Sequence, residues 1–308
     1  MSKPTYQQVH TDVPLTNISV AYVPASFIAP QVFPLVPVQK ISDKFYVYTK
    51  ADWLRREAQP RAAGTRAARG DYGLTTDTYT CVEIAIGKGV PDEIVRNADN
   101  PLRPLEDGTK WVTSQLLLEM ENEVATTVNT AGAWSGSATP GVLWSNDTST
   151  PLDDVETAVN SVVSTIGVLP NTGVLGRGLW RFLKNHPEIL DRIKGSAGPN
   201  SPAVVTLNAV AALMELDRLV VGSAISDTAA EGAASSLSYI WGNHLLVAYV
   251  TRGPSLMEPS AGYVFTYENR RIERFREDQE HQDVLTGYQS WDTKIVASDA
   301  GYRIISAA

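Results

Sequence analysis

One stretch of the chain, residues 44–132, constrains the fold more than any other. It contains two strand-like arms, 45–49 and 79–86, joined by a connection, 54–71, that has almost no large apolar side chains to bury. The first arm is aromatic and β-branched, and the second alternates apolar and polar residues at a period of two. Connections longer than roughly 12–15 residues without internal structure are usually functional or disordered. The stretch is either a loose basic loop or a long hairpin that becomes ordered when it lies across another subunit.

The connection 54–71, called the arginine tip below, is locally basic in an acidic protein. The whole chain has a formal net charge of −8 and a pI of about 5.1, so it is not built to hold nucleic acid by bulk charge. The cations of the arginine tip are Arg55, Arg56, Arg61, Arg66 and Arg69. Arginine pairs well with phosphate, but there is little aromatic interleaving for stacking bases, which favours an acidic face of a sister subunit over nucleic acid. The candidate acids on that neighbour are Glu119, Glu123, Glu277, Asp278 and Glu280.

A long helix is expected after the hairpin, over residues 109–131. Apolar residues recur at the three-and-four spacing of one buried stripe, and Gly132 offers a left-handed stop. At about 1.5 Å per residue the helix is roughly 35 Å long. Glu119 and Glu123 lie four residues apart on one face, an arrangement that a cation from elsewhere would relieve.

The rest of the chain predicts a mixture of helices and strands. Proline density over residues 1–40 argues against helix and central strand and favours an extended arm whose apolar side chains need an external surface. A helix is expected from Pro151, capped by Thr150 and stopped by Gly167, followed by helical residues 179–194 interrupted at Pro187. Residues 226–236 are expected to form a loop. Further helix is expected at 207–216, and strands at 174–175, 219–221, 237–241, 244–250, 262–267, 287–297 and 302–306. The fold class is therefore α+β, without a repeated βαβ period.

Composition excludes several classes of protein. At 308 residues and 43% hydrophobic content, the chain can form a real core. A single cysteine, Cys81, excludes an internal disulfide framework, and its place in a strand predicts a small packed side chain. The sequence shows neither a signal peptide nor the ~18 consecutive apolar residues of a membrane span, so we expect a cytosolic protein without membrane contact.

Motifs for catalysis are absent from the sequence. The glycines around Lys88 and Arg177 lack the spacing of phosphate-binding loops, and no Gly-x-Ser-x-Gly elbow occurs. The four histidines are scattered and are expected to be surface or capping residues. The carboxylate pair Glu277 and Asp278 lies in 274–280, expected to be a solvated charged segment. We therefore expect no catalytic, metal or cofactor site.

The order of these parts resembles the major capsid proteins of tailed bacteriophages, the Hong Kong 97-type fold. The resemblance covers essentially the whole chain and depends on element order and on the phrases at 29–34 and 46–48. It implies an N-terminal arm (1–43), an E-loop (44–90), a P-domain with a spine helix (91–144), an A-domain (145–262) and returning P-domain and A-domain strands (263–308).

The resemblance also implies a non-enzymatic function. Hexamers and pentamers of the chain would form an icosahedral shell around double-stranded DNA, without sequence specificity, in a virion assembled in the host cytoplasm. Because the chain begins close to the N-terminal arm, we expect a separate scaffolding protein, besides a portal and possible decoration proteins. Some family members cross-link through an E-loop lysine, but neither Lys44 nor Lys50 matches that motif.

Three alternatives remain open at this point. An encapsulin-type compartment shell would share the fold and would need an inner groove for cargo. A soluble hydrolase with an unrecognised site would show a deep polar cleft in a monomer. A nucleic-acid-binding protein using the arginine tip would show salt-sensitive DNA affinity.

Overall fold

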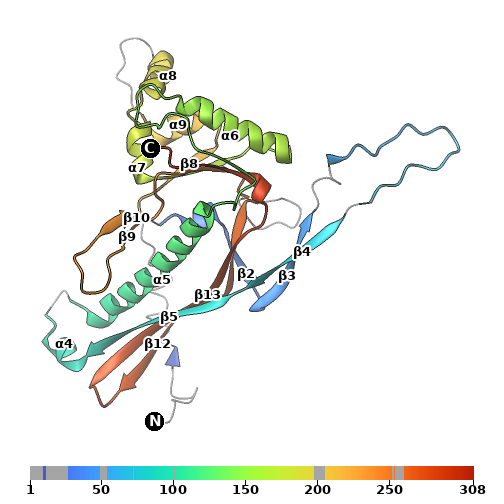
Figure 1. Ribbon diagram of the computed structural model, residues 1–308. Coiled ribbons are helices and arrows are strands. Elements are labelled where there is room, and N and C mark those ends of the chain that lie inside the picture. Colours follow the sequence, from blue (N-terminus) through green and yellow to red (C-terminus); the bar gives the residue numbers. More distant parts are fainter. Residues whose placement is uncertain are drawn as a thin grey trace.

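The fold is α+β, as predicted, with two five-stranded sheets and two small hairpins among the residues that the structure describes (Figure 1). The computed structural model describes residues 10–11, 27–48, 54–71, 73–99, 102–197, 205–251, 253 and 260–308. Much of the expected N-terminal arm, and Lys50, lie outside these residues. None of the described helices is both long and apolar enough to cross a membrane.

The first sheet is built around a long antiparallel hairpin. Its strands are β12 (Gly262–Glu277) and β13 (Gln282–Ile295). β5 (Val82–Pro91) pairs with β13, while β1 (His10–Thr11) and β2 (Leu35–Val38) pair with β12. The two long strands extend well beyond the strands predicted at 262–267 and 287–297. The segment 274–280, expected to be solvated and charged, is exposed over much of its length, but its first four residues continue β12 by pairing with β13.

The helix α5 (Pro104–Asn129) lies on one face of this sheet (Figure 1). It begins five residues before the predicted start, because Pro104 fits the first turn and Glu106 and Asp107 favour the positive end of the helix. The apolar residues of its buried face are Val112, Leu116, Met120, Val124 and Val128. The helix ends at Asn129, and Gly132, with φ of 76°, lies in the turn that follows rather than at the stop itself.

The predicted hairpin around the arginine tip forms, but its return arm is divided. β3 (Ser42–Tyr48) pairs with β4 (Leu74–Thr80), and the chain then enters the first sheet as β5. The change of sheet occurs at Cys81, whose N–H donates to the carbonyl oxygen of Ile41 at 2.8 Å. Val82, the first residue of β5, is 61% exposed, whereas Ile84 and Ile86 on the same side of the strand are half-buried.

The second sheet has the order β6–β14–β11–β7–β8. These strands are β6 (Gly136–Ala138), β14 (Gly301–Ile304), β11 (Leu245–Ala248), β7 (Thr172–Gly176) and β8 (Arg218–Gly222). β11 is buried along its whole length, and β7 runs parallel to β8. One apolar cluster joins this sheet to its helices, and another joins it to α5 and the first sheet.

Four helices accompany the second sheet: α6 (Pro151–Ile166), α7 (Arg177–Leu183), α8 (Pro187–Ala197) and α9 (Leu207–Leu213). Gly167 ends α6 in the left-handed conformation, with its N–H bonded to the Val163 carbonyl at 2.8 Å, as predicted. Thr150 makes no side-chain capping bond, contrary to expectation; only its carbonyl accepts, from the N–H of Asp154. The predicted break at Pro187 is present.

The remaining elements are short. α2 (Ala29–Val32) contradicts the expectation that prolines exclude helix from the arm, because Pro30 occupies the first turn, where no N–H is needed. β10 (Leu237–Tyr239) lies in the strand expected at 237–241, and it forms a hairpin with β9 (Ile225–Asp227), which was not predicted and takes in the first residues of the loop expected at 226–236. α4 (Asp92–Asn97) follows β5, and the short helix η2 (Ser298–Ala300) precedes β14.

Candidate assembly interface

The stem of the β3–β4 hairpin is fixed to the body by aromatic packing. The ring of Phe265 on β12 stacks on Tyr79 at 4.7 Å between centroids and contacts Phe45 at 5.3 Å. Cys81 lies in the same cluster, 5% exposed, and burial raises the pKa of its thiol. The expectation of a small packed cysteine is confirmed, and the stem gives the arginine tip a rigid base.

The arginine tip has almost no support of its own. Nearly all of its residues are exposed, and it projects away from the body (Figure 1). Its turn is held by Thr65, whose N–H and hydroxyl both donate to the carbonyl of Ala62, at 3.2 and 2.8 Å, and by Gly64, with φ of 81°. A tip of this kind has no buried area to offset its ordering entropy.

The arginines of the tip make few contacts within the chain. Arg55 lies 4.0 Å from the Glu57 carboxylate, and Arg61 donates to the carbonyl of Thr65 at 2.8 Å. The other three, Arg56, Arg66 and Arg69, have no carboxylate within ion-pair distance among the described residues. The five guanidinium groups are therefore available to an external partner.

The candidate acids on α5 have different environments. Glu119 is exposed, whereas Glu123 is half-buried and accepts a hydrogen bond from the indole N–H of Trp291 at 2.7 Å. The indole N–H of Trp291 therefore already binds Glu123, which leaves this carboxylate less open to a partner than Glu119. Glu119 is the freer of the two carboxylates.

Between them, Glu121 is fully buried, and sequence reasoning missed it. Its carboxylate accepts hydrogen bonds from the backbone N–H groups of Ile28, at 3.0 Å, and Ala29, at 2.7 Å, and from the indole N–H of Trp241, at 2.6 Å. Burial raises the pKa of Glu121, and these hydrogen bonds act in the opposite direction. Its spacing in the sequence could have identified it, because Glu121 lies four residues after Leu117 and three before Val124, on the buried side of the helix.

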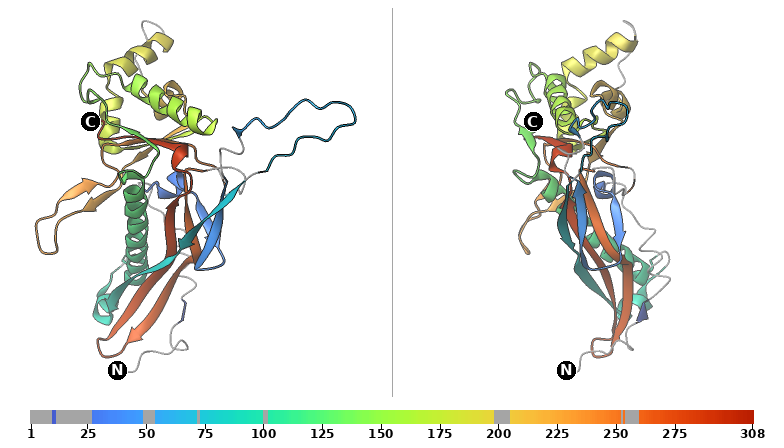
Figure 2. Two further views of the ribbon diagram at one scale, coloured as in Figure 1. Left: turned by 45° about the vertical axis from the view of Figure 1, so that its right-hand side comes forward. Right: turned by 90° about the vertical axis from the view of Figure 1, so that its right-hand side faces the viewer.

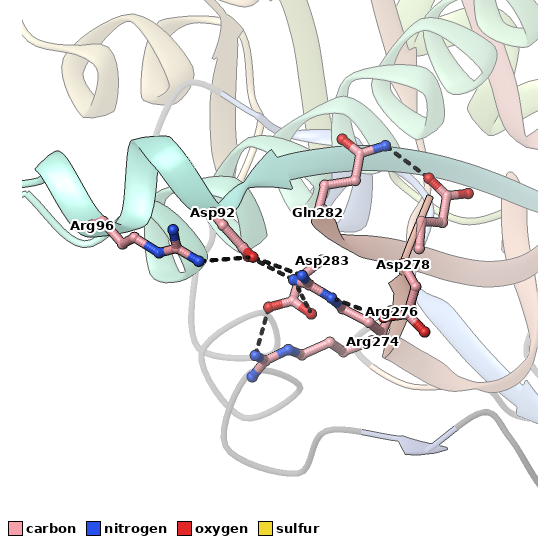
Figure 3. Close-up of polar contacts among 8 residues, drawn as sticks. Asp92, Arg96, Arg274, Arg276, Asp278, Gln282 and Asp283 are labelled. Carbon is pink, nitrogen blue, oxygen red and sulfur yellow. Dashed lines mark hydrogen bonds and ion pairs between the residues drawn. The ribbon is translucent and has the colours of Figure 1, made fainter. Parts of the chain in front are cut away.

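A second polar cluster lies at the far end of the β12–β13 hairpin, where it meets the start of α4 (Figure 3). Arg276 forms a bidentate pair with Asp92, both N–O distances being 2.6 Å, and lies 3.8 Å from Asp283. Arg274 contacts Asp283 at 2.7 Å, and Arg96 lies 3.6 Å from Asp92. Arg276 lowers the pKa of Asp92, and the hydrogen bond to Asp92 raises the pKa of Arg276. The cluster fixes the end of the hairpin.

The other three candidate acids belong to this hairpin end. The side-chain amide of Gln282 donates to both Glu277, at 2.7 Å, and Glu280. Asp278 lies 3.4 Å from Arg276 but its side chain is 92% exposed, so it remains open to a partner. These three acids thus lie together at the hairpin end, whereas Glu119 and Glu123 belong to α5.

The arginine tip and the acids of the hairpin end lie at opposite extremes of the molecule (Figures 1 and 2). The two regions therefore cannot meet within one subunit in this conformation.

One buried serine–histidine pair has to be tested as a catalytic nucleophile and base. Ser149 Oγ lies 3.0 Å from Nε2 of His186. However, Nδ1 of His186 accepts the N–H of Glu188 at 3.3 Å, so in the neutral ring the hydrogen is on Nε2, which cannot then take a proton from the serine. His186 is a capping histidine at the start of α8. Among the described residues, no group of three or more His, Cys, Asp or Glu side chains could hold a metal ion.

Known proteins with similar sequences are phage proteins. No family model matches the chain. It is 29% identical to the major capsid protein of Pseudomonas phage JBD67, over 78% of this chain and 77% of that protein. It is 25% identical to the major capsid protein of Burkholderia phage BcepMu, over 95% of each.

Solved structures share the fold over nearly the whole chain. A phage-related protein from Bordetella bronchiseptica has a TM-score of 0.78 at 25% identity, covering 97% of this chain and 98% of that one. The capsid structure of cyanophage P-SCSP1u has a TM-score of 0.60 at 10% identity, covering 99% of this chain and 92% of that one. The second likeness concerns the fold alone.

Proposed function

Because this chain is a capsid shell protein, related to phage major capsid proteins and built on the Hong Kong 97-type fold, we propose that it assembles as hexamers and pentamers. The shell is icosahedral and encloses double-stranded DNA without sequence specificity. The chain is a structural, non-enzymatic component of the virion, as the related capsid proteins indicate. Assembly takes place in the host cytoplasm.

The exposed arginine tip is the observation that supports this proposal most directly. It extends beyond the body from an aromatic stem, and among the described residues its arginines make only a loose ion pair, from Arg55, and a hydrogen bond to a carbonyl, from Arg61. A long loop with this charge becomes ordered when a neighbour supplies both buried surface and acids. In the assembled shell the tip lies across an adjacent subunit.

The partners of the tip are carboxylates on the neighbour. Of the five candidate acids, Glu119 and Asp278 are the most open, whereas Glu123, Glu277 and Glu280 already accept hydrogen bonds in their own chain. Each exposed pair contributes only about 0–1 kcal/mol. Because the pairs recur at every subunit contact, their summed free energy stabilises the shell.

The parts of the chain then have distinct tasks in the shell. Residues 1–43 form an N-terminal arm and 44–90 the E-loop. Residues 91–144 form the P-domain with its spine helix, 145–262 the A-domain, and 263–308 the returning strands. A separate scaffolding protein, a portal and possible decoration proteins complete the partners.

Electron microscopy with sedimentation tests the proposal. The chain is expressed alone and together with the proteins of its genomic neighbourhood, and both samples are imaged. Closed shells, tubes or capsomers are the expected result, and a scaffolding requirement predicts regular shells only in the second sample. A persistent compact monomer in both samples would contradict the proposal and return attention to a soluble enzyme.

Two further readouts separate the remaining alternatives. Shells that package DNA when a terminase and portal are supplied support a virion, whereas shells filled with a co-expressed enzyme indicate a compartment. Tight, salt-sensitive binding of DNA by the unassembled subunit would favour a nucleic-acid-binding protein instead.

A further inference from the structure

The hairpin β9–β10 presents an apolar face to solvent. Its register pairs Tyr239 with Ile225 and Leu237 with Asp227. Because alternate residues of a strand share a face, Ile225, Leu237 and Tyr239 lie together beside Asp227, and the three apolar residues are 49%, 65% and 48% exposed. We call these three residues the hairpin patch. Exposed apolar groups that cluster in this way mark interaction sites, and a two-stranded hairpin alone is only marginally stable in water.

The hairpin is held in one geometry at both ends. At its base, the N–H of Ile240 donates to the carbonyl of the buried Ala224 at 3.0 Å. Near its turn, the Asp227 carboxylate accepts from the N–H groups of Ala229, at 3.0 Å, and Ser236, at 2.8 Å. The hairpin patch is therefore presented to a partner in a preorganised form.

A second apolar patch lies directly after α6. Val168 and Leu169 follow the helix stop at Gly167 and are 39% and 58% exposed. Leu54, at the start of the arginine tip, is 59% exposed and lies beside them, since its Cδ2 would be 3.8 Å from a Cβ on Gly167. Leu54, Val168 and Leu169 together are the loop patch.

The two patches lie at opposite ends of one pair of strands. The loop patch precedes β7, and the hairpin patch follows β8. β7 and β8 run parallel in register, from Thr172 beside Arg218 to Gly176 beside Gly222. The β9–β10 hairpin accordingly projects from one side of the molecule and the arginine tip from the other (Figures 1 and 2).

We propose that the hairpin patch of one subunit docks on the loop patch of the next copy of this chain, so that successive contacts close into a ring. Two different patches on opposite sides of a subunit make a head-to-tail contact, which closes when the rotation between copies permits. A second copy is the occupant because copies of a capsid shell protein pack against one another, and the two apolar surfaces lie on opposite sides of the subunit, where neighbouring copies meet. The inference rests on the proposed shell function and names its ring interface.

Cysteine cross-linking in assembled particles tests the contact. Leu237→Cys and Leu169→Cys are introduced singly and together, and Cys81 does not interfere because it is buried. After mild oxidation, denaturing gels of the double variant are expected to show a ladder of covalent multimers. Each single variant is expected to remain a monomer. Leu237→Cys combined with Leu102→Cys, at a residue that is 63% exposed outside both patches, is the matched control and gives no ladder.

The outcomes distinguish this inference from the proposed function. Well-formed shells of the double variant without a ladder overturn the docking while the shell function stands. A dimer from Leu237→Cys alone shows a self-pairing contact and also overturns it. If wild-type chain forms no shells under any condition, the proposed function fails instead.

A charge-swap pair covers the case in which the cysteine variant does not assemble. Leu237→Lys and Leu169→Glu are each expected to lose shells while keeping the melting temperature of the free subunit. The double substitution is expected to recover shells, because the new charges face each other. An equal loss of shells in the two single variants and in the double variant would overturn the docking.

Discussion

Glu121 and the arginine tip carry their charges in opposite environments, one buried and the other exposed. One carboxylate is fully buried and accepts hydrogen bonds from three N–H donors, those of Ile28 and Ala29 at the start of α2 and of Trp241 shortly after β10. Five guanidinium groups are exposed and have scarcely any partner within the part of the chain that the structure describes. The first arrangement completes the subunit, and the second leaves a requirement that only another molecule can meet.

The difference lies in what each region contributes to the folded subunit. Leaving a buried donor without an acceptor costs about 1–3 kcal/mol, so removing Glu121 acts on the stability of the monomer. Exposed charges that make no contacts leave that stability nearly unchanged when replaced. Substitutions in the two regions should therefore separate folding from assembly.

Removing the Glu121 carboxylate should have the largest effect on stability. Glu121→Ala leaves the N–H groups of Ile28, Ala29 and Trp241 without an acceptor, and we expect a loss of at least about 3 kcal/mol in the free energy of unfolding. Glu121→Gln keeps one acceptor oxygen but places an amide N–H₂ group against N–H donors. We therefore expect a loss of about 1–3 kcal/mol in the free energy of unfolding. Urea unfolding of the unassembled subunit measures both.

The matched control for this prediction is Glu123→Gln, two residues away on α5. Its single bond from Trp291 can be kept by the amide oxygen, so the expected loss is at most about 1 kcal/mol. Equal losses for the two glutamines would show that the three donors to Glu121 do not set the difference.

Two glycines extend the comparison to packing. A Cβ on Gly287 would lie 2.5 Å from Val112 Cγ1 and 3.0 Å from Leu116 Cδ1, so Gly287→Ala pushes α5 away from β13 and should cost about 1–3 kcal/mol. A Cβ on Gly64, in the arginine tip, meets nothing within 4 Å. Gly64→Ala strains only its own turn, and we expect the unfolding of the body to change by about 0.5 kcal/mol or less. A similar loss in both variants would mean that the tip is coupled to the core.

The cluster at the hairpin end should make a smaller contribution that depends on pH. Arg276 holds the pKa of Asp92 below its ordinary value of 3.8. A lowered pKa stabilises the fold above the unfolded value, and this stabilisation is lost as the pH falls through the folded value. The difference in melting temperature between wild type and Asp92→Asn should therefore be present at pH 7 and shrink below about pH 4. A difference that stays constant to pH 2 would contradict this role of Asp92.

The sequence predicts local features better than the partners of individual groups. Pro151 and Gly167 mark the ends of α6 because helix termini have strong local chemistry. The continuation of β12 through Arg274 and Arg276 could not be predicted, because pairing with β13 and the bond to Asp92 outweigh a charged composition. Glu121 was missed for the same reason: its donors lie more than ninety residues away in the sequence, at Ile28, and beyond it at Trp241.

The smallest expected effect on stability belongs to the arginine tip, where the effect on assembly should be the greatest. Among the described residues, the double charge reversal Arg61→Glu with Arg66→Glu removes one exposed hydrogen bond, from Arg61 to the carbonyl of Thr65, so the free energy of unfolding should change by about 0.5 kcal/mol or less. Electron microscopy should nevertheless show few or no shells, because the reversed charges repel the acids of the neighbour at every contact.

The control for the tip reversal, Lys184→Glu with Lys194→Glu, makes the same change in net charge at exposed residues around α8. Shells that form normally from the tip variant would contradict the pairing of charges between subunits. A loss of shells in both variants would instead attribute the effect to net charge. A loss confined to the tip, with the subunit still folded, would show that the chain separates the two tasks in space: Glu121 holds the subunit together and the arginines hold subunits to each other.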